Sequence, residues 1–582
     1  PARYNPDSTP RSARVRPYLI EPSLQTHALY LVGFDETRGA VRTFKVERIR
    51  DVSVTPDRFE PPEAGAFLEY DPARSFDVDS ESAEIRLRYR DRKVYAVGHG
   101  MAADWEIDDG AVTRVFLEPV PSLVVVGIET TGFAPGAPES EALQLSRLAQ
   151  IDTDTSGVAA NLNAFVNAFE QWVGTQEGRV LTFGTESHVA ARIVARSRAA
   201  VERMRQSIEL LSSPSKKDLR AAFSLGMAAM RLQMRQTAAH QVATEWPLPE
   251  PKWRPFQLGF ILVALASTVD ELHEDRDLVD LIWFPTGGGK TEAYLGLSAI
   301  EIFRRRIADG PEGGGTAILT RYTLRLLTTQ QFQRTAALVC AMELLRRGGP
   351  HADPRARLMS PFTIGLWVGN EVTPGTKSEA KDALSRLHNA ARPEEANQFQ
   401  VESCPWCRTA LLPERKDTNR SRYGFEFSGN DLNIHCTNAE CEFSSSLPVL
   451  VVDDEIYAEP PTILLATVDK FARIQFRPEA GRLLGLGTIF RPPSIVIQDE
   501  LHLLSGPLGT TVAVFDAVIR LLLRHAGGVP KIIASTATIR ASDDQVRGLY
   551  GRPVGLYPPA GLDDDRTFFS QPAKSGMGRL FV

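Results

Sequence analysis

Residues 284–291 read Phe-Pro-Thr-Gly-Gly-Gly-Lys-Thr, and this stretch decides the fold. It follows an apolar run at 278–284 that predicts a strand, and it precedes a helical run at 292–306. Glycines let such a loop curl so that its N–H groups and the helix N-terminus face phosphate oxygens. We expect Lys290 to reach the β- and γ-phosphates of ATP and Thr291 to bind Mg²⁺. The alternative is a glycine-rich turn with an incidental lysine. The predicted nucleotide contacts are Thr286, Gly287, Gly288, Gly289, Lys290 and Thr291.

A second apolar run, at 494–498, ends in the sequence Asp499-Glu500-Leu501-His502. We expect Asp499 to hold Mg²⁺ through water and Glu500 to polarise the attacking water. An Asp-Glu pair after an apolar run is usually a solvated strand end, but the lysine loop upstream makes the pair specific. The predicted catalytic residues are therefore Glu500, Asp499, Lys290 and His502.

Two weaker motifs fit the same site. Ser535-Thr536-Ala537-Thr538 follows a predicted strand at 531–534, and its hydroxyls are candidates for coupling nucleotide state to strand movement. Upstream, Gln257 follows Pro255 and is a candidate for reading the adenine edge, with Phe256 as a neighbour of the base. Alone, a hydroxyl-rich strand end or a surface glutamine looks the same.

Four of the five cysteines form two close pairs, Cys404 with Cys407 and Cys436 with Cys441. Each pair can place two thiolates on one side of a turn, and two pairs complete a tetrahedral zinc site. The alternative is four reduced thiols that are neighbours. Cys340 lies in a helical pattern and is predicted to be a small core residue. So few cysteines exclude a disulfide scaffold and suit a reducing cytoplasm.

The composition is that of a globular protein. The 582 residues include 66 basic and 72 acidic side chains, so the net charge is −6, and 43% of residues are hydrophobic. These values exclude wholesale disorder, and the near-neutral charge argues against a histone-like binder but does not exclude a local nucleic-acid channel. The apolar stretch at 256–269 is too short to span a bilayer, so we expect a cytoplasmic protein that has no membrane partner.

The rhythm of the chain predicts an α/β fold with a parallel sheet, preceded by a β-rich region and a helical region. Helices are expected at 158–173, 188–211 and 217–240. The strands predicted for the sheet are 278–284, 317–320, 363–368, 462–466, 494–498 and 531–534. Further strands are predicted near the N-terminus at 28–34, 41–46, 49–55, 84–97 and 112–128. The predicted domains are a β module at 1–65, a β-rich region at 66–135, a helical region at 136–248 and the α/β domain at 249–582, with a zinc-binding insertion at 376–450.

Together these motifs resemble the first RecA-like domain of a superfamily 2 DExH helicase. Three longer segments, 282–294, 321–334 and 498–509, are similar to the helicase subunit of DISARM anti-phage defence systems, the DrmA type. The resemblance implies an ATP-dependent DNA helicase or translocase that works with a partner subunit. It also implies DNA-backbone contacts from Arg321, Thr323, Arg325, Thr467 and Lys470. The alternative for these charges is an ordinary solvated surface, which is also the interpretation of the run at 304–306.

The N-terminal segment resembles a WYL domain, a small SH3-like β module. Leu29-Tyr-Leu-Val-Gly-Phe-Asp35 and the following segment 41–49 carry this resemblance, although Leu29 stands where the family has tryptophan. It implies ligand or nucleic-acid sensing, with Tyr30, Arg42 and Arg48 as candidate residues. The alternative is a plain packing module.

The sequence also predicts what this chain lacks. A superfamily 2 motor needs a second RecA-like domain with an arginine finger, and only 44 residues follow Thr538 (582 − 538). We therefore expect ATP–Mg²⁺ binding with feeble hydrolysis and no unwinding unless that domain is supplied elsewhere. Two non-enzymatic alternatives remain, a nucleic-acid sensor and an assembly subunit whose nucleotide site is structural.

Overall fold

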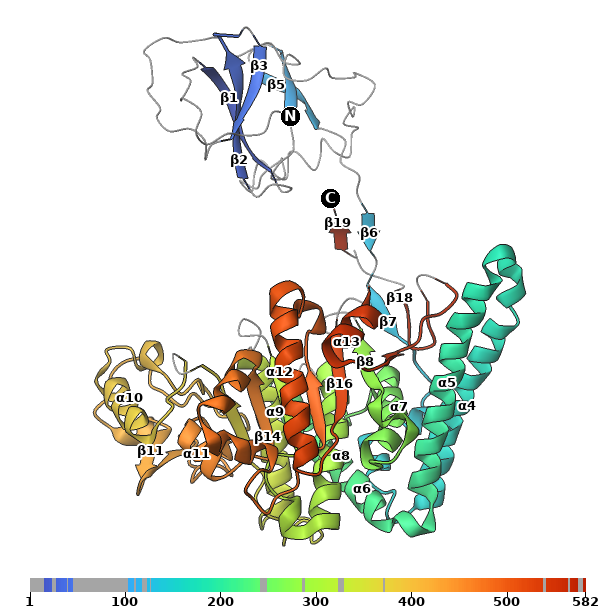
Figure 1. The fold of residues 1–582 in the computed structure, drawn as a ribbon, viewed down its shortest axis with the longest axis vertical. Helices are drawn as coiled ribbons and strands as arrows, with labels where there is room; N and C mark the ends of the chain where they lie inside the picture. The colour runs from blue at the N-terminus through green and yellow to red at the C-terminus, as the bar shows by residue number, and fades with distance from the viewer. Residues whose placement is uncertain are drawn as a thin grey trace. The chain divides into compact units, whose positions relative to one another are not determined.

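The structure is a computed structural model, and the residues it describes are 15–23, 28–38, 40–45, 103–108, 111–117, 123–125, 127–240, 249–284, 288–322, 329–369, 372–536, 541–563, 566–573 and 579–581. The chain forms two units, Pro1–Gly127 with Ser575–Val582, and Ile128–Lys574 (Figure 1). The strands predicted at 49–55 and 84–97 lie outside the described residues.

The first unit is built from antiparallel strands. β1 (Val15–Ser23), β2 (Ala28–Asp35) and β3 (Ala40–Lys45) form one sheet, in which Asp35 pairs with Ala40. β2 and β3 therefore form a hairpin, and the strands predicted at 28–34 and 41–46 are confirmed. β4 (Ala103–Asp108) pairs with β5 (Ala111–Leu117), and β6 (Leu123–Val125) pairs with β19 (Arg579–Phe581).

The second unit contains an eight-stranded sheet in which all neighbouring strands are parallel. Its strands, in spatial order, are β13 (Val449–Leu450), β10 (Ile364–Trp367), β14 (Ile463–Thr467), β9 (Ile318–Tyr322), β15 (Ile495–Gln498), β16 (Lys531–Thr536), β8 (Val279–Trp283) and β17 (Val554–Tyr557). The six predicted sheet strands are confirmed. The two edge strands, β13 and β17, were not predicted. A short antiparallel pair, β7 (Ile128–Thr130) with β18 (Ser570–Pro572), also belongs to this unit.

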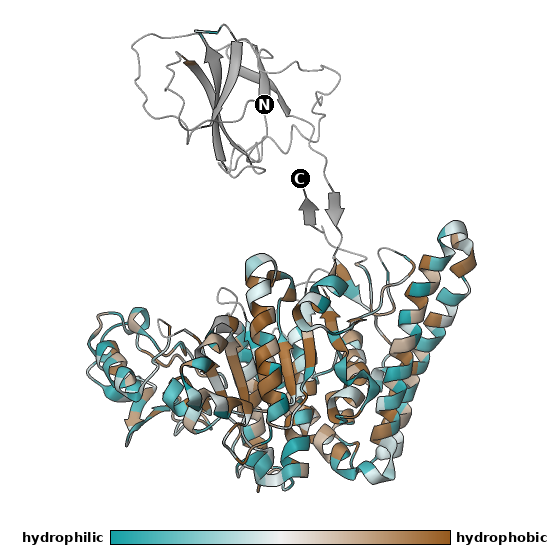
Figure 2. Ribbon diagram, viewed as in Figure 1, coloured by the Kyte–Doolittle hydropathy of each residue, from teal (hydrophilic) through white to brown (hydrophobic). Residues whose placement is uncertain are grey.

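Both faces of the sheet are covered, which explains why its strands are continuous apolar runs. Successive side chains in a strand point to opposite faces. Ile282 accordingly lies in one hydrophobic core, while its neighbour Leu281 lies in a second core on the other face. Figure 2 shows the central strands as almost wholly apolar.

Long helices build the first of these cores. The members are α4 (Thr155–Glu177), α5 (Ser187–Ser212), α6 (Lys217–His240), α7 (Pro255–Val269), α8 (Lys290–Asp309) and α9 (Thr329–Arg346). The three predicted helices are confirmed as α4, α5 and α6. Cys340 is fully buried on α9, as predicted.

The second core is covered by α12 (Gly506–His525) and α13 (Ser542–Tyr550), together with α11 (Asp453–Ala458). By length and composition α12 could cross a membrane. It packs instead on the sheet through Val512, Ile519 and Leu523, while Leu521 remains 66% exposed.

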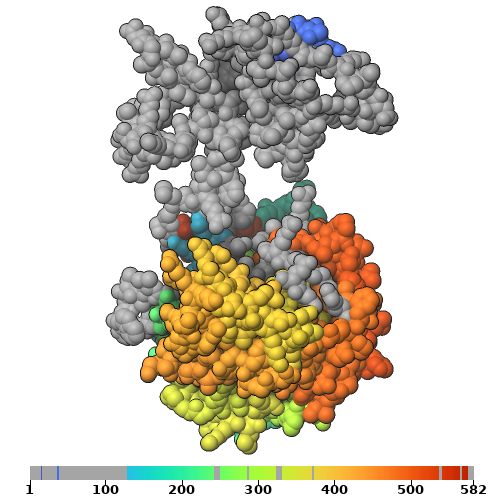
Figure 3. Space-filling model, turned by 90° about the vertical axis from the view of Figure 1, so that its left-hand side faces the viewer, coloured from blue at the N-terminus to red at the C-terminus, as the bar shows by residue number. Residues whose placement is uncertain are grey.

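The cysteine-bearing segment lies between strands β10 and β13 and contains α10 (Lys377–Asn389) and the hairpin of β11 (Phe425–Ser428) with β12 (Asp431–Ile434). The chain leaves the sheet after β10 and returns to pair with the same strand at β13. An insertion of this kind adds to the edge of a sheet without disturbing its order. Figure 3 views the second unit from this side, where the insertion (yellow) faces the viewer.

The interpretation of residues 304–306 as a solvated face is wrong. Arg305 is 1% exposed and donates to the carbonyls of Gly314, Arg491 and Pro492. Arg306 is 5% exposed and donates to the carbonyl of Pro361. Both guanidinium groups bond backbone carbonyls at loops that the far end of α8 reaches, so they are buried and hydrogen-bonded at the same time.

Candidate nucleotide site and cysteine cluster

The order of the sheet brings three predicted motifs together. β15, β16 and β8 are neighbours, and the chain leaves their carboxyl ends at Asp499, at Thr536 and into the glycine loop. Ligand sites of open α/β sheets lie at this end of the strands. Thr286 and Gly287 of the loop, Thr323, Arg325 and Thr538 lie outside the described residues.

Lys290 is the first residue of α8, and Gly289 before it has φ +94°, a conformation that favours glycine. The Lys290 Nζ donates to the Phe284 carbonyl at 2.7 Å, so the amine bonds the loop itself. Burial lowers the pKa of Lys290, and the nearby charges of Glu500 and Asp499 oppose that shift. A buried cation at a helix N-terminus is suited to binding phosphate, whereas the two carboxylates beside it repel phosphate and are ligands of the kind that Mg²⁺ prefers.

Asp499 is the hub of the site. Its Oδ2 accepts from Tyr294 Oη at 3.1 Å and from Gln331 Nε2 at 3.0 Å. Its Oδ1 accepts from Ser535 Oγ at 2.6 Å and from the Glu500 amide at 3.0 Å. The carboxylate is 3% exposed, and these bonds from α8, α9 and β16 fix its orientation.

Tyr294 and Gln331 were not predicted as site residues. The Tyr294 hydroxyl also lies 3.4 Å from Thr291 Oγ1, so it joins the two groups predicted to bind Mg²⁺. Helical spacing was the available signal, because Tyr294 lies three residues after Thr291 and on the same face. No local signal connected Gln331 to Asp499, 168 residues further along the chain.

Glu500 has a left-handed backbone with φ +48°, which is uncommon for a residue other than glycine and typical of strained functional sites. Burial, and then the charge of Asp499, raises the pKa of Glu500 above its ordinary value. His502 Nδ1 lies 3.5 Å from Glu500 Oε2 and 3.2 Å from Thr536 Oγ1. The acidic motif and the hydroxyl motif are thus in direct contact, through Ser535 with Asp499 and through His502 with Thr536.

Gln257 and Phe256 contact the two ends of the glycine loop, at Gly289 and at Phe284. The Gln257 amide donates to the Gly289 carbonyl at 2.8 Å, and its oxygen accepts from the Arg254 amide at 2.8 Å. Phe256 is fully buried and stacks on Phe284 with ring centroids 4.0 Å apart. These contacts position the glycine loop, and an adenine contact by either residue stays a prediction.

The described candidates for DNA contact are buried. Arg321 is 2% exposed and pairs with Asp516 at 2.6 Å, and Lys470 is 2% exposed and pairs with Asp453 at 2.6 Å. Thr467 is 1% exposed. A phosphate contact by Arg321 or Lys470 would require a buried ion pair to open, so these contacts also stay predictions.

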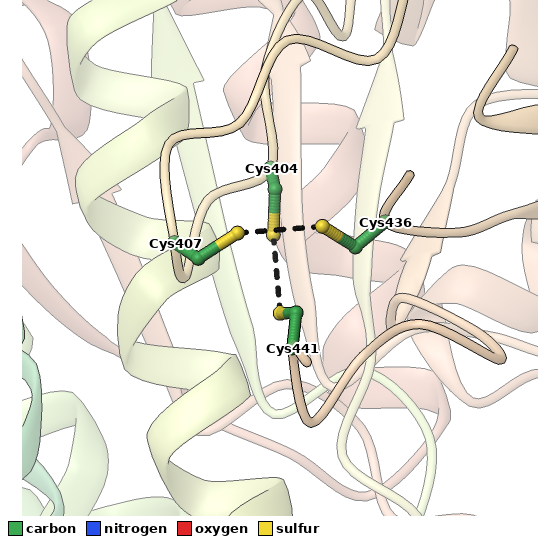
Figure 4. A group of neighbouring side chains, drawn as sticks. All are labelled: Cys404, Cys407, Cys436 and Cys441. Atoms are coloured by element: carbon green, nitrogen blue, oxygen red, sulfur yellow. Dashed lines mark hydrogen bonds between the residues drawn. The ribbon is translucent and has the colours of Figure 1, made fainter. Parts of the chain in front are cut away.

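The four paired cysteines converge, as Figure 4 shows. All four sulfurs lie within 4.8 Å of one another, with Cys407 and Cys436 at 3.3 Å and Cys404 and Cys441 at 4.0 Å. Four thiolates around Zn²⁺ would have sulfurs about 3.8 Å apart, because Zn–S bonds are about 2.3 Å and tetrahedral. The cluster therefore fits zinc in donor type, number and spacing.

The chain is similar to a known domain family and to a known defence protein. Residues 2–54 match the model of the WYL domain. Over 545 residues the chain is 32% identical to DISARM protein DrmA of Bacillus paralicheniformis. The alignment covers 83% of this chain and 47% of that protein. The chain thus spans about half the length of the curated relative it matches. The resemblances to the DrmA-type DISARM subunit and to the WYL domain are confirmed.

Two solved structures align over smaller shares. One is the DUF1998 helicase MrfA, with a TM-score of 0.29 and 12% identity over 56% of this chain and 32% of that chain. The other is MrfA bound to DNA, with a TM-score of 0.29 and 13% identity over 55% of this chain and 27% of that chain.

Proposed function

We propose that the chain is the nucleotide-binding part of an ATP-dependent DNA helicase or translocase of a bacterial anti-phage defence system. Its similarity to DISARM protein DrmA supports the defence role and a partner subunit. The observation that carries the nucleotide role is that Lys290, on the helix that follows β8, lies near Asp499 and Glu500 at the end of β15, with only β16 between the two strands. The parallel sheet supports assigning this unit to the RecA-like class.

Each residue has a defined part in this proposal. Lys290 exchanges the Phe284 carbonyl for a phosphate oxygen of ATP. Thr291 and Asp499 hold Mg²⁺, which neutralises phosphate charge when bound. Glu500, whose pKa is raised, accepts a proton from the attacking water. Ser535 is placed to report the state of Asp499 to β16.

The test combines ATP binding by this chain with ATP hydrolysis by the complete protein, each with and without single-stranded DNA. We expect Lys290→Ala to lose ATP binding. Glu500→Gln should keep binding and lose turnover by about 10²-fold or more, because it removes a general base. DNA-stimulated turnover that survives in Glu500→Gln would contradict the assignment.

Contacts already made within the chain also support a second proposal, a nucleic-acid sensor. The amine of Lys290 is already bonded within the loop, and Arg321 and Lys470 are already paired. In this second proposal ATP binding releases these contacts and changes conformation without hydrolysis. Tight ATP binding by the complete protein without turnover would support the sensor and refute the motor.

We also propose that the four clustered cysteines bind Zn²⁺. Cys404→Ser should lose the metal, because three sulfurs leave the tetrahedron open. Cys340→Ala is the matched control, since it removes the fifth cysteine and leaves the cluster intact. Equal zinc content in the Cys404→Ser variant and the control would refute the assignment.

A further inference from the structure

The first two turns of α9 carry Gln331 and Gln333, which contact different sites. Gln331 Nε2 donates to Asp499 Oδ2 at 3.0 Å. Gln333 Nε2 donates to the Ser403 carbonyl at 2.9 Å and to its hydroxyl at 3.2 Å, next to Cys404. Two residues apart in a helix means about 200° apart around its axis. One helical turn therefore lies between the nucleotide site and the cysteine cluster.

Both ends of the Gln333 amide are fixed. Its Oε1 accepts from Arg408 Nη1 at 3.2 Å, and Arg408 has a left-handed backbone with φ +63° directly after Cys407. The Arg408 amide donates to the Cys404 carbonyl at 2.9 Å, which closes the turn between the first two cysteines. Gln333 is 3% exposed, so a lost partner would leave buried polar groups unsatisfied.

The same turn also reaches α8. Arg334 Nη1 lies 3.3 Å from Glu292 Oε1, two residues after Lys290. The start of α9 is thus bonded to the cysteine cluster, to Asp499 and to the first turn of α8.

We propose that Gln333 is a positioning residue that ties the metal-loaded cysteine cluster to Asp499. The cluster fixes residues 403–409, Gln333 fixes the start of α9 on them, and Gln331 in the same part of the helix orients the Asp499 carboxylate. The consequence for Mg²⁺–ATP rests on the proposed function, whereas the mechanical link does not.

Hydrogen–deuterium exchange of the full chain without nucleotide tests the link. Gln333→Ala should loosen the start of α9 and with it the bond from Gln331 to Asp499. The Glu500 amide donates to the same carboxylate, so hydrogen exchange in the segment Ile495–Leu503 should become faster on the order of tenfold. Gln236→Ala is the matched control. Gln236 on α6 donates to the Trp406 carbonyl of the same cysteine turn at 3.0 Å, and α6 carries no predicted residue of the nucleotide site.

A second variant and a chelator sharpen the test. Gln333→Glu keeps the shape but cannot donate to Ser403, so it should also speed exchange. Removing zinc should act like Gln333→Ala in the wild type and add nothing in that variant. Both Gln333 variants should raise the Mg²⁺ concentration needed for ATP binding, as loss of an outer-shell partner does.

Equal exchange at Ile495–Leu503 in Gln333→Ala, Gln333→Glu and Gln236→Ala would overturn the inference. Failure of the wild type to bind ATP would instead refute the proposed function. In that case the exchange result would still decide whether Gln333 positions Asp499.

Discussion

Replacing Asp280 with Asn should destabilise the second unit measurably. Asp280 lies on β8 with no exposed surface, and its carboxylate forms ion pairs with two basic side chains. Arg203 on α5 binds it with two bonds of 2.8 and 2.9 Å, and Lys531 on β16 lies at 3.0 Å. Lys531 is also fully buried. Asn keeps the shape of the side chain but leaves two cations without this anion.

The size of the effect follows from burial. Removing one partner of a buried ion pair costs about 3–5 kcal/mol. The second unit spans 447 residues (574 − 128 + 1). At about 2.1 cal/mol/K per residue its unfolding entropy is roughly 0.9 kcal/mol/K, so the loss corresponds to a Tm lower by about 3–5 °C.

Scanning calorimetry of the full chain at pH 7 measures this shift. The matched control is Glu395→Gln, which breaks the exposed pair with Arg392, where both side chains are about 70% exposed. Exposed pairs contribute roughly 0–1 kcal/mol, so its Tm should move by about 1 °C or less. Equal shifts in the two variants would refute the reasoning.

The pH dependence has a definite sign. Burial raises the pKa of Asp280, but the charges of Arg203 and Lys531 outweigh it and hold that pKa below its ordinary 3.8. A lowered carboxylate pKa stabilises the folded state above the unfolded value. The Tm difference between wild type and Asp280→Asn should thus be constant above about pH 5 and shrink below 3.8.

Three further predictions follow from the site. Tyr294→Phe keeps the ring but removes the hydroxyl between Thr291 and Asp499, so the Mg²⁺ concentration needed for ATP binding should rise about tenfold, and an unchanged Mg²⁺ titration would argue against that role. If Glu500 is the base, hydrolysis by the complete protein should increase with pH through a pKa above 4.5, since burial raises that pKa; a pH–rate profile that keeps this limb in Glu500→Gln would exclude Glu500. Arg321→Met should lower the Tm by about 3 °C or less, because it removes one of the two arginines that pair with the buried Asp516 and leaves Arg520 in place, and it should leave the salt dependence of DNA binding unchanged; a salt slope lower by about one would show a phosphate contact instead.

Local patterns predicted the elements well. The strand at 494–498 and the helix at 217–240 could be read from sequence because their apolar spacing matches the period of the element. The hub at Asp499 could be placed at a strand end for the same reason. The cysteine pairs gave their cluster from spacing alone.

Contacts between distant segments could not be predicted in this way. Arg305 looks like any surface arginine in a helix, and only the tertiary fold brings it to the carbonyls of residues 491 and 492. Lys470 likewise follows a strand end, where a ligand contact was expected, but Asp453 comes from another segment to pair with it. Burial of a charge depends on its partner, and the partner is not visible in local sequence.

The buried Arg305 also limits how this unit can move. Helix α8 begins at Lys290 and, at its other end, is anchored through Arg305 to the segment that leads into β15 and Asp499. Helix α8, which carries Lys290, and strand β15, which leads to Asp499, are therefore held together at the ends opposite to these two residues. A movement driven by a ligand must shift α8 and β15 together, or leave both in place and act through the side chains near Lys290 and Asp499.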